Sequence, residues 1–186
     1  MTNKKYLPNK KNGGEVPVPT DKRVLTVAVA CQRCIECKKQ KARNWSIRLQ
    51  EEIRHDKKGK FITLTFNDES LKQLCKEIKT NETGYELENA IATLAVRRYL
   101  ERWRKKHKVS IKHWLITELG HNGTERIHIH GLMFTDNVED IEKIWQYGHV
   151  YIGNYVNEET INYISKYINK TDMMHKEYDA KIQNLS

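Results

Sequence analysis

The sequence contains no long apolar run. The longest one, residues 24–30, is interrupted by Thr26 and falls far short of the about 20 apolar residues that a membrane-spanning helix needs. No apolar segment follows the basic N-terminus closely enough to form a secretory signal peptide. These absences exclude a membrane span and predict a soluble, cytoplasmic protein with no membrane partner.

The sequence also lacks the loop on which most ATP-dependent enzymes rely. There is no Gly-x-x-x-x-Gly-Lys-Ser/Thr motif, and Gly13 and Gly14 lie in a basic segment rather than between a strand and a helix. We therefore expect no ATP hydrolysis and no intrinsic helicase activity.

Proline is scarce, and its 3 occurrences all fall within the first 20 residues. This segment is rich in lysine and has almost no apolar periodicity, which is typical of a flexible arm. We therefore predict a flexible basic arm over residues 1–20 and a single domain over residues 21–186, without internal repeats.

Acidic residues are scarce in the first third of the chain. The whole sequence has 33 Lys and Arg against 24 Asp and Glu, a net charge of +9, and residues 1–60 hold 16 of the basic and only 6 of the acidic residues. Such a positive field suits a polyanion, most commonly nucleic acid, whose phosphates basic side chains contact without reading the bases. A second interpretation stays open, in which these residues only solubilise the surface.

Apolar periodicity predicts an alternating order of strands and helices. The predicted strands are residues 24–30, 61–66, 111–119, 126–134 and 149–152, and the predicted helices are residues 33–55, 86–106, 138–145 and 157–170. From residue 61 to residue 152 the order is β-α-β-β-α-β, which predicts an α+β fold with a ferredoxin-like antiparallel sheet and helices on one face. A C-terminal tyrosine-bearing helix is appended, with Asn157 as its N-cap.

Two histidines occupy alternate positions of one predicted strand. His128 and His130 therefore point to the same side of the sheet, and Ile129 points to the other. Glu118 lies near the end of the preceding strand, from which its carboxylate can reach the same side across a short turn. Two imidazoles and a carboxylate with open positions suit Mn²⁺ or Mg²⁺ over a phosphate better than a structural zinc. The alternative is that these histidines are ordinary polar strand residues.

The last predicted helix carries an apolar stripe and two tyrosines. The stripe consists of Ile161, Ile164 and Ile168. On the opposite side we expect Tyr163 and Tyr167, each followed three residues later by a lysine, Lys166 and Lys170. A phenol can attack phosphorus if a nearby ammonium or metal ion stabilises its developing charge. The alternative is that the tyrosines only help to cover a core.

Three of the four cysteines follow one another at three-residue intervals, as Cys31, Cys34 and Cys37, whereas Cys75 is distant. This spacing is typical of metal ligands, but it also places the side chains along one helical face, where reduced cysteines pack as small apolar groups. Cytoplasmic cysteines do not argue for disulfides. Packing, metal binding and a redox role all stay open.

Together these motifs resemble the HUH endonuclease superfamily, and more narrowly the rolling-circle replication initiators of small single-stranded DNA phages, the gokushovirus-like microviruses. The resemblance is carried by the His128-Ile-His130 strand, the upstream acid, the strand over residues 61–66 and the two Tyr-x-x-Lys units. The segment from Cys31 through Arg48 is similar to those initiators as well. The resemblance covers roughly residues 24–170.

The resemblance implies a function and a site. His128, His130 and Glu118 correspond to ligands of a divalent metal, Mg²⁺ or Mn²⁺; Tyr163 and Tyr167 correspond to nucleophiles, with Lys166 and Lys170 as helpers; and residues 63–65 correspond to a motif beside the site that contacts DNA. The implied activity is nicking and rejoining of single-stranded DNA at the phage origin through a 5′-phosphotyrosine. The implied setting is the cytoplasm of a bacterial host that supplies helicase and polymerase.

Two alternatives from the sequence stay open. One is a transposase or relaxase of the same superfamily, which a single tyrosine or a large partner domain would favour. The other is a basic single-stranded DNA-binding protein without catalytic activity, in which the histidines, acid and tyrosines are structural. The second alternative predicts metal-independent binding and no covalent adduct with DNA.

Overall fold

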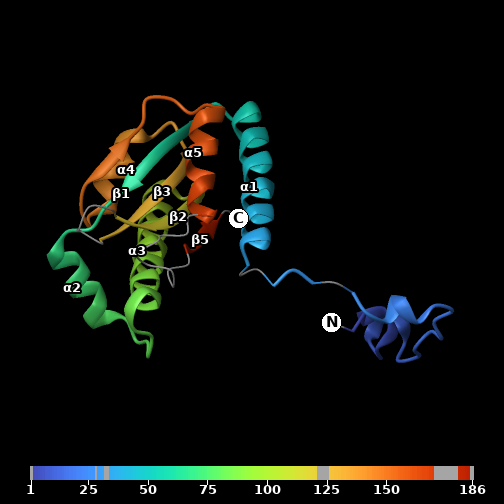
Figure 1. Ribbon diagram of the computed structural model, residues 1–186. Helices are drawn as coiled ribbons and strands as arrows, with labels where there is room; N and C mark the ends of the chain where they lie inside the picture. The colour runs from blue at the N-terminus through green and yellow to red at the C-terminus, as the bar shows by residue number, and fades with distance from the viewer. Residues whose placement is uncertain (1, 28, 32–33, 121–125, 170–179, 185–186) are drawn as a thin grey trace. The chain divides into compact units, whose positions relative to one another are not determined.

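The computed structural model describes residues 2–27, 29–31, 34–120, 126–169 and 180–184 (Figure 1). The chain divides into two compact units, Met1–Cys37 and Lys38–Ser186. The predicted boundary at residue 20 lies inside the first of these units, which extends to the start of the first long helix. Each unit is described by itself below.

The first unit consists of short 3₁₀ helices and turns. The helices are Lys4–Tyr6, Lys10–Asn12 and Lys22–Leu25. The strand predicted over residues 24–30 is wrong, since its first residues belong to the third of these helices and Thr26 makes only an isolated bridge with Thr2. The Asp21 carboxylate accepts a hydrogen bond from the Arg23 backbone N–H. Such a local side-chain cap competes with strand pairing and favours the helical turn.

Apart from its first helix, which starts in the first unit, the second unit holds all the long elements. They are α1 (Ile35–His55), β1 (Gly59–Leu64), α2 (Asp68–Glu77), α3 (Gly84–His107), β2 (Lys112–Leu119), β3 (Ile127–Phe134), α4 (Val138–Trp145), β4 (Val150–Ile152), α5 (Glu158–Asn169) and β5 (Ile182–Asn184). All except α2 and β5 were predicted from the sequence, with bounds that differ by no more than two residues. Among the described helices, none has the length and apolar content of a membrane span.

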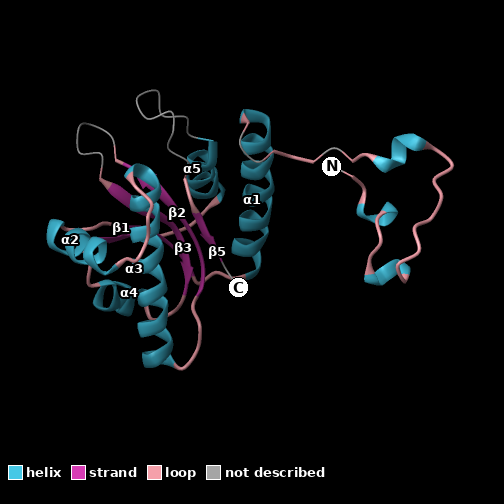
Figure 2. Ribbon diagram, turned by 90° about the horizontal axis from the view of Figure 1, so that it is seen from below, coloured by secondary structure: helices cyan, strands magenta, loops and turns pink. Residues whose placement is uncertain are grey.

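The five strands form one sheet in the order β4-β1-β3-β2-β5, in which all neighbours are antiparallel. Strands β1 and β2 flank β3 and run parallel to each other, and the chain crosses between them through α2 and α3. Strands β3 and β4 likewise flank β1 and are connected through α4. Two such interleaved crossovers make the ferredoxin-like arrangement, so the predicted α+β fold is confirmed. Strand β5 extends the sheet beyond β2 (Figure 2).

Both faces of the sheet are covered, each by its own apolar cluster. Helices α3 and α4 pack on one face, where Leu115, Ile129 and Met133 are buried. Helices α1 and α5 lie side by side on the other face, over Trp114 and Leu132 (Figures 1 and 2). The helices of the ferredoxin-like unit therefore cover one face, as predicted, and the appended tyrosine-bearing helix closes the opposite face together with α1.

Strands β2 and β3 approach each other unusually closely at Gly131. A Cβ atom at this position would lie 2.0 Å from the carbonyl oxygen of Trp114. Only glycine fits there, because backbone atoms on a neighbouring strand cannot move aside as a flexible side chain can. Gly131 thus keeps in place the pairing that carries the polar residues described next.

Candidate functional site

Polar side chains interrupt the apolar face beneath α5 at one end of the central strands. Strand β3 brings His128 and His130 to this face, and β2 places Glu118 directly opposite His128. Strand β1 places Thr63 directly opposite His130. Because side chains alternate along a strand, these four groups point to the same side of the sheet.

His130 is held by contacts at both of its ring nitrogens. Its Nε2 lies 2.6 Å from a carboxylate oxygen of Glu118, and both side chains are 11% exposed. Its Nδ1 lies 2.9 Å from the hydroxyl oxygen of Thr63. A neutral imidazole satisfies both contacts by donating from Nε2 and accepting at Nδ1. The ring orientation is therefore set by two different strands.

His128 lies partly buried beside the end of β2. Burial lowers the pKa of its imidazole, and the nearby His130 lowers it further. The backbone N–H of Gly120 donates to the Arg126 carbonyl over 2.8 Å, which closes the ends of the two strands. A Cβ atom at Gly120 would lie only 2.8 Å from Cε1 of His128. Gly120 therefore leaves room for an imidazole that stays neutral.

Helix α5 brings the two tyrosines to this group of side chains. The Tyr167 ring stacks on His130 with 4.9 Å between ring centroids and 10° between ring planes. The Tyr167 hydroxyl donates to the Tyr163 hydroxyl over 2.6 Å. Burial raises the pKa of Tyr167, and its hydrogen bond to Tyr163 and the negative charge of Glu118 raise it further. Tyr167 thus holds its proton firmly at neutral pH.

The two tyrosines differ in exposure, which corrects the expectation that both lie opposite the apolar stripe. Ile161, Ile164 and Ile168 are buried, as expected. Tyr167 is only 7% exposed and belongs to the same buried cluster, whereas Tyr163 is 49% exposed. Tyr167 follows Ile164 by three residues, so at 100° per residue it lies only about 60° from that position.

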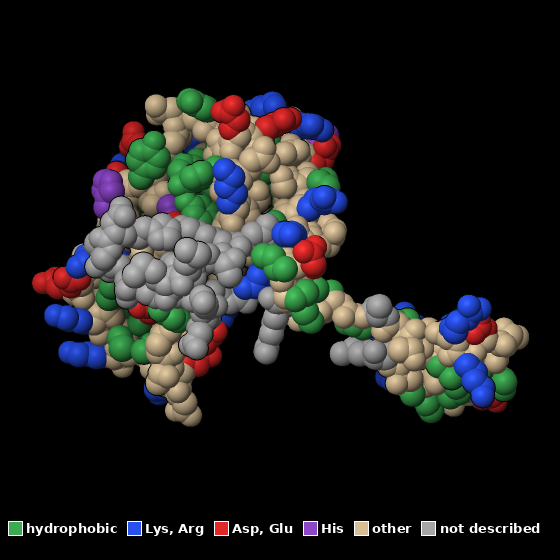
Figure 3. Space-filling model, in the orientation of Figure 1, with side chains coloured by type: hydrophobic (Ala, Val, Ile, Leu, Met, Phe, Trp, Pro, Cys, Tyr) green, Lys and Arg blue, Asp and Glu red, His purple; other side chains and the backbone are tan. Residues whose placement is uncertain are grey.

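These side chains line an open pocket of about 810 Å³. Lys166 borders it and is exposed, whereas Lys170 lies outside the described residues. The pocket also contains side chains that the sequence analysis had not assigned to the site, namely His149 and Tyr151. In the space-filling view, histidine side chains of the second unit reach the surface near hydrophobic ones (Figure 3).

Strand pairing is the signal by which these additional residues could have been found. Tyr151 of β4 lies directly opposite Thr63 of β1, so it shares the face of the sheet that carries the histidines. His149 is fixed through its backbone, since its N–H donates to the Thr65 hydroxyl over 2.9 Å. The Phe61 ring, also on β1, meets the Tyr163 ring edge to face at 6.2 Å. Sequence periodicity alone does not show which strands are neighbours.

The predicted metal ligands are close together but not gathered around one point. His130 and Glu118 contact each other directly, and the donor atoms of His128, His130 and Glu118 do not all lie within 4.8 Å of one another. The ring centroids of His128 and His130 are 6.4 Å apart. That separation is within reach of two imidazoles that each place a nitrogen about 2.1 Å from a shared ion. The donor types and the neutral His128 fit a divalent cation.

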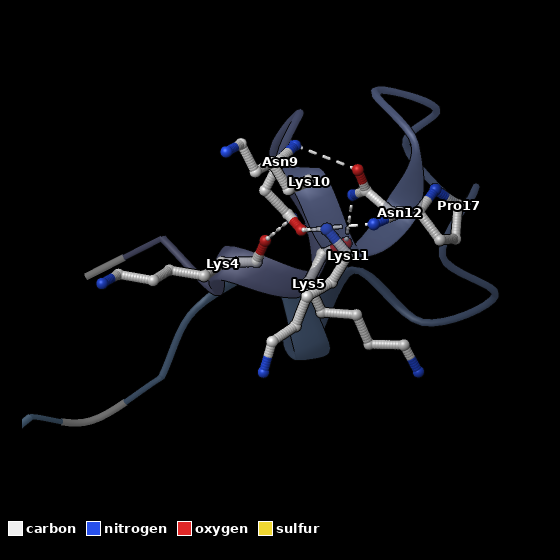
Figure 4. A pocket seen from close by; sticks show the side chains of 7 residues that line it. All are labelled: Lys4, Lys5, Asn9, Lys10, Lys11, Asn12 and Pro17. Atoms are coloured by element: carbon white, nitrogen blue, oxygen red, sulfur yellow. Dashed lines mark hydrogen bonds between the residues drawn. The ribbon is translucent and has the colours of Figure 1, made fainter.

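The first unit has a hollow of its own, of about 670 Å³. It is lined by Lys4, Lys5, Lys10 and Lys11 together with Asn9, Asn12 and Pro17. The asparagines cap the local turns, and the lysine ammonium groups point away from one another (Figure 4). Such spread charges suit contacts with several phosphates of an extended polyanion better than the capture of one small anion.

Comparison with known proteins gives one match. The sequence model of a family of replication-associated proteins, described under the name ORF2, matches residues 59–172, more than half of the chain. The matched region runs from β1 through α5 and so contains the whole polar pocket. No curated protein and no solved structure matches the chain.

Proposed function

The chain belongs to the ORF2 family of replication-associated proteins, and from this premise we propose that it initiates rolling-circle replication by nicking and rejoining single-stranded DNA at an origin. The observation that carries this proposal is the placement of two tyrosine hydroxyls 2.6 Å apart in the pocket that holds His128, His130 and Glu118. A phenol beside a polar, potentially metal-binding group is what phosphoryl transfer to tyrosine requires.

In the proposed reaction, a tyrosine oxygen attacks the phosphorus of the scissile phosphodiester. The new bond joins the phenolic oxygen to the 5′-phosphate, the bond from phosphorus to the 3′-oxygen breaks, and the departing 3′-oxygen takes up a proton. The phenol loses its own proton in the same step. Because the energy of the phosphodiester is kept in the phosphotyrosine, rejoining needs no ATP.

Metal binding is part of this proposal. His128, His130 and Glu118 would hold Mg²⁺ or Mn²⁺, and the direct contact between His130 and Glu118 would open to receive it. Such an ion polarises the scissile phosphate and offsets negative charge that develops on it. Thr63 holds the His130 ring in place through its hydroxyl, and the lowered pKa of His128 keeps a neutral imidazole available.

The lysines of the two Tyr-x-x-Lys units would assist the tyrosines. Lys166 borders the pocket, and its ammonium group is a source of positive charge for the phenolate of Tyr163. We propose the corresponding role for Lys170 toward Tyr167. After one circuit of replication, the second tyrosine cuts the regenerated origin, and the released 3′-hydroxyl attacks the first phosphotyrosine to close a circle.

Binding and replication need further partners in this proposal. The basic side chains of the first unit would contact DNA phosphates, which gives affinity without sequence preference and makes binding salt-sensitive. The free 3′-hydroxyl would serve a host polymerase, and a host helicase would separate the strands. We propose single-stranded DNA of a phage origin as the substrate and the bacterial cytoplasm as the place of action.

The proposal is tested by incubating the full chain with single-stranded origin DNA and Mn²⁺, followed by a denaturing gel. We expect a protein band shifted by covalent DNA, and loss of that band in the Tyr163→Phe, Tyr167→Phe double variant. A non-catalytic DNA-binding protein would instead bind DNA without metal and give no adduct. An adduct that persists in the double variant would disprove the assignment of the nucleophiles.

A further inference from the structure

Outside this pocket, three cysteines converge where α1 begins. The ligand atoms of Cys31, Cys34 and Cys37 all lie within 4.8 Å of one another, and among the described residues this is the group of three or more potential metal ligands that meets this distance. We propose that these three thiolates bind one thiophilic divalent ion of the zinc type. This site is separate from the proposed Mg²⁺ or Mn²⁺ site and does not depend on it.

The sulfur positions match those around a single tetrahedral ion. The Sγ atoms of Cys31 and Cys37 are 3.7 Å apart. Thiolates bound about 2.3 Å from a tetrahedral zinc ion are separated by about 3.8 Å, so little movement is needed to receive the ion. In an iron–sulfur cluster, by contrast, each cysteine binds a different iron atom, which spreads the sulfur atoms across the whole cluster.

The backbone around the cluster favours negative charge on sulfur. Cys34 directly precedes α1 and Cys37 lies in its first turn, where the helix dipole stabilises a thiolate. The backbone N–H of Cys34 also donates to the Cys31 sulfur over 3.3 Å. A backbone hydrogen bond lowers the pKa of the Cys34 thiol, but its contacts with the other two cysteines raise that pKa overall. A divalent ion removes this conflict, because it binds all three sulfurs as thiolates and releases their protons.

Exposure separates this proposal from the two other interpretations of the cysteines. Cys31 and Cys34 are exposed and Cys37 is half-buried, so the group does not pack as part of an apolar core. The cysteines are free, and the 3.7 Å between Cys31 and Cys37 is far longer than the about 2.05 Å of a disulfide. Three thiols that converge at the surface are instead accessible to a metal ion.

A bound ion would tie the chain at Cys31 to the first turn of α1. Among the described residues, no fourth His, Cys, Asp or Glu donor joins the group. In the isolated chain, the fourth position of the ion therefore belongs to solvent. Because an ion that binds the folded chain stabilises it, removal of the metal should loosen the start of α1.

The test is titration of the full chain with Co²⁺, after removal of metal under reducing conditions. We expect one equivalent to produce a thiolate-to-cobalt charge-transfer absorption together with the intense ligand-field bands of tetrahedral cobalt. One equivalent of Zn²⁺ should then abolish these bands. Native mass spectrometry in the presence of Zn²⁺ should show one tightly bound ion per chain.

Matched variants distinguish this site from other sources of the signal. Cys34→Ser should remove the charge-transfer band, whereas Cys75→Ser, which changes an exposed cysteine outside the cluster, should keep it. His128→Ala should also keep the band, since imidazoles do not produce it, so this result is independent of the proposed nicking activity. Circular dichroism checks that each variant is folded, and Cys37→Ser provides a second variant of the cluster.

Three results would overturn the proposal. These are a wild-type chain without the charge-transfer band, a Cys34→Ser or Cys37→Ser variant that keeps the full band, and a chain purified with iron and acid-labile sulfide bound to the three cysteines.

Discussion

The hydroxyl of Tyr167 donates a hydrogen bond to the hydroxyl of Tyr163 across 2.6 Å. The two phenols are therefore not equivalent, although they occupy corresponding places in two Tyr-x-x-Lys units. Tyr163 is 49% exposed and faces the open pocket, whereas Tyr167 is 7% exposed and its pKa is raised by burial. When Tyr163 ionises, the hydrogen bond from Tyr167 stabilises its phenolate. We therefore infer that Tyr163 attacks first.

The first prediction follows from this asymmetry. Tyr163→Phe should slow initial nicking by roughly 100-fold or more, since the first nucleophile is removed and the second remains protonated. Tyr167→Phe should slow it only about tenfold, the loss expected for one hydrogen bond to a developing charge. Both variants should fail to release closed circles. Peptide mass spectrometry of the adduct, together with gel-based nicking rates, measures these effects.

In the wild type, the first adduct should map to Tyr163. An adduct found first on Tyr167, or equal nicking rates for the two single variants, would contradict the inferred order. DNA attached to neither tyrosine would contradict the mechanism itself.

The second prediction concerns the metal. His128→Ala should abolish nicking while leaving DNA binding and its salt dependence nearly unchanged, because affinity comes from contacts between basic side chains and phosphates. His55→Ala, which removes an exposed histidine of α1, is the control and should nick normally. Nicking rates with Mn²⁺, Mg²⁺ or excess chelator, and binding curves at two salt concentrations, give the comparison. Full wild-type activity in chelator would exclude the metal assignment.

The third prediction uses two glycines of neighbouring surroundings. Gly120→Ala places a Cβ atom 2.8 Å from Cε1 of His128, so the ring must turn away from its present position. We expect a large loss of nicking with about 1–3 kcal/mol of destabilisation, typical of overpacking at a site where a side chain can yield. Gly131→Ala places its Cβ atom 2.0 Å from the Trp114 carbonyl oxygen, which cannot yield. That variant should lose the fold.

Thermal unfolding and nicking assays on both glycine variants separate a damaged site from a damaged sheet. If Gly120→Ala nicked as fast as the wild type, the position of the His128 ring would not matter for the reaction.

The fourth prediction concerns stability at acidic pH. Burial lowers the pKa of both His113 and His128 in the folded chain. The unfolded chain, whose histidines titrate near about 6.5, therefore binds more protons than the folded chain in this range. The free energy of unfolding should thus fall as the pH drops from about 7.5 through about 6.5 and below. Urea unfolding at a series of pH values measures this slope.

His113→Gln should flatten this dependence, because it removes one of the two buried imidazoles while keeping a side chain that can donate to the Ile111 carbonyl, as Nδ1 of His113 does. His55→Gln changes an exposed imidazole and should leave the slope as it is. An unchanged slope in His113→Gln would show that this residue does not contribute.

The sequence by itself determined the local elements and the composition of the site. Helix α4 (Val138–Trp145) has the predicted bounds, and the alternation in β3 correctly places Ile129 on the opposite face from His128 and His130. Helix α2 was missed although Asn67 caps it and acidic residues fill its first turn, because the segment is short and weakly apolar. Such signals depend only on neighbouring residues, which is why they can be found along the chain.

Only the tertiary structure decided how these residues meet. The neighbours of β1 and β3 in the sheet bring Thr63 and Tyr151 to the histidines, and the packing of α5 buries Tyr167 while leaving Tyr163 exposed. The pairing of His130 with Glu118 and the stacking of Tyr167 on His130 arise in the same way. Residue spacing fixes the direction of a side chain relative to its own helix or strand. The partner that it meets depends on strand order and helix packing, which join residues distant in the chain.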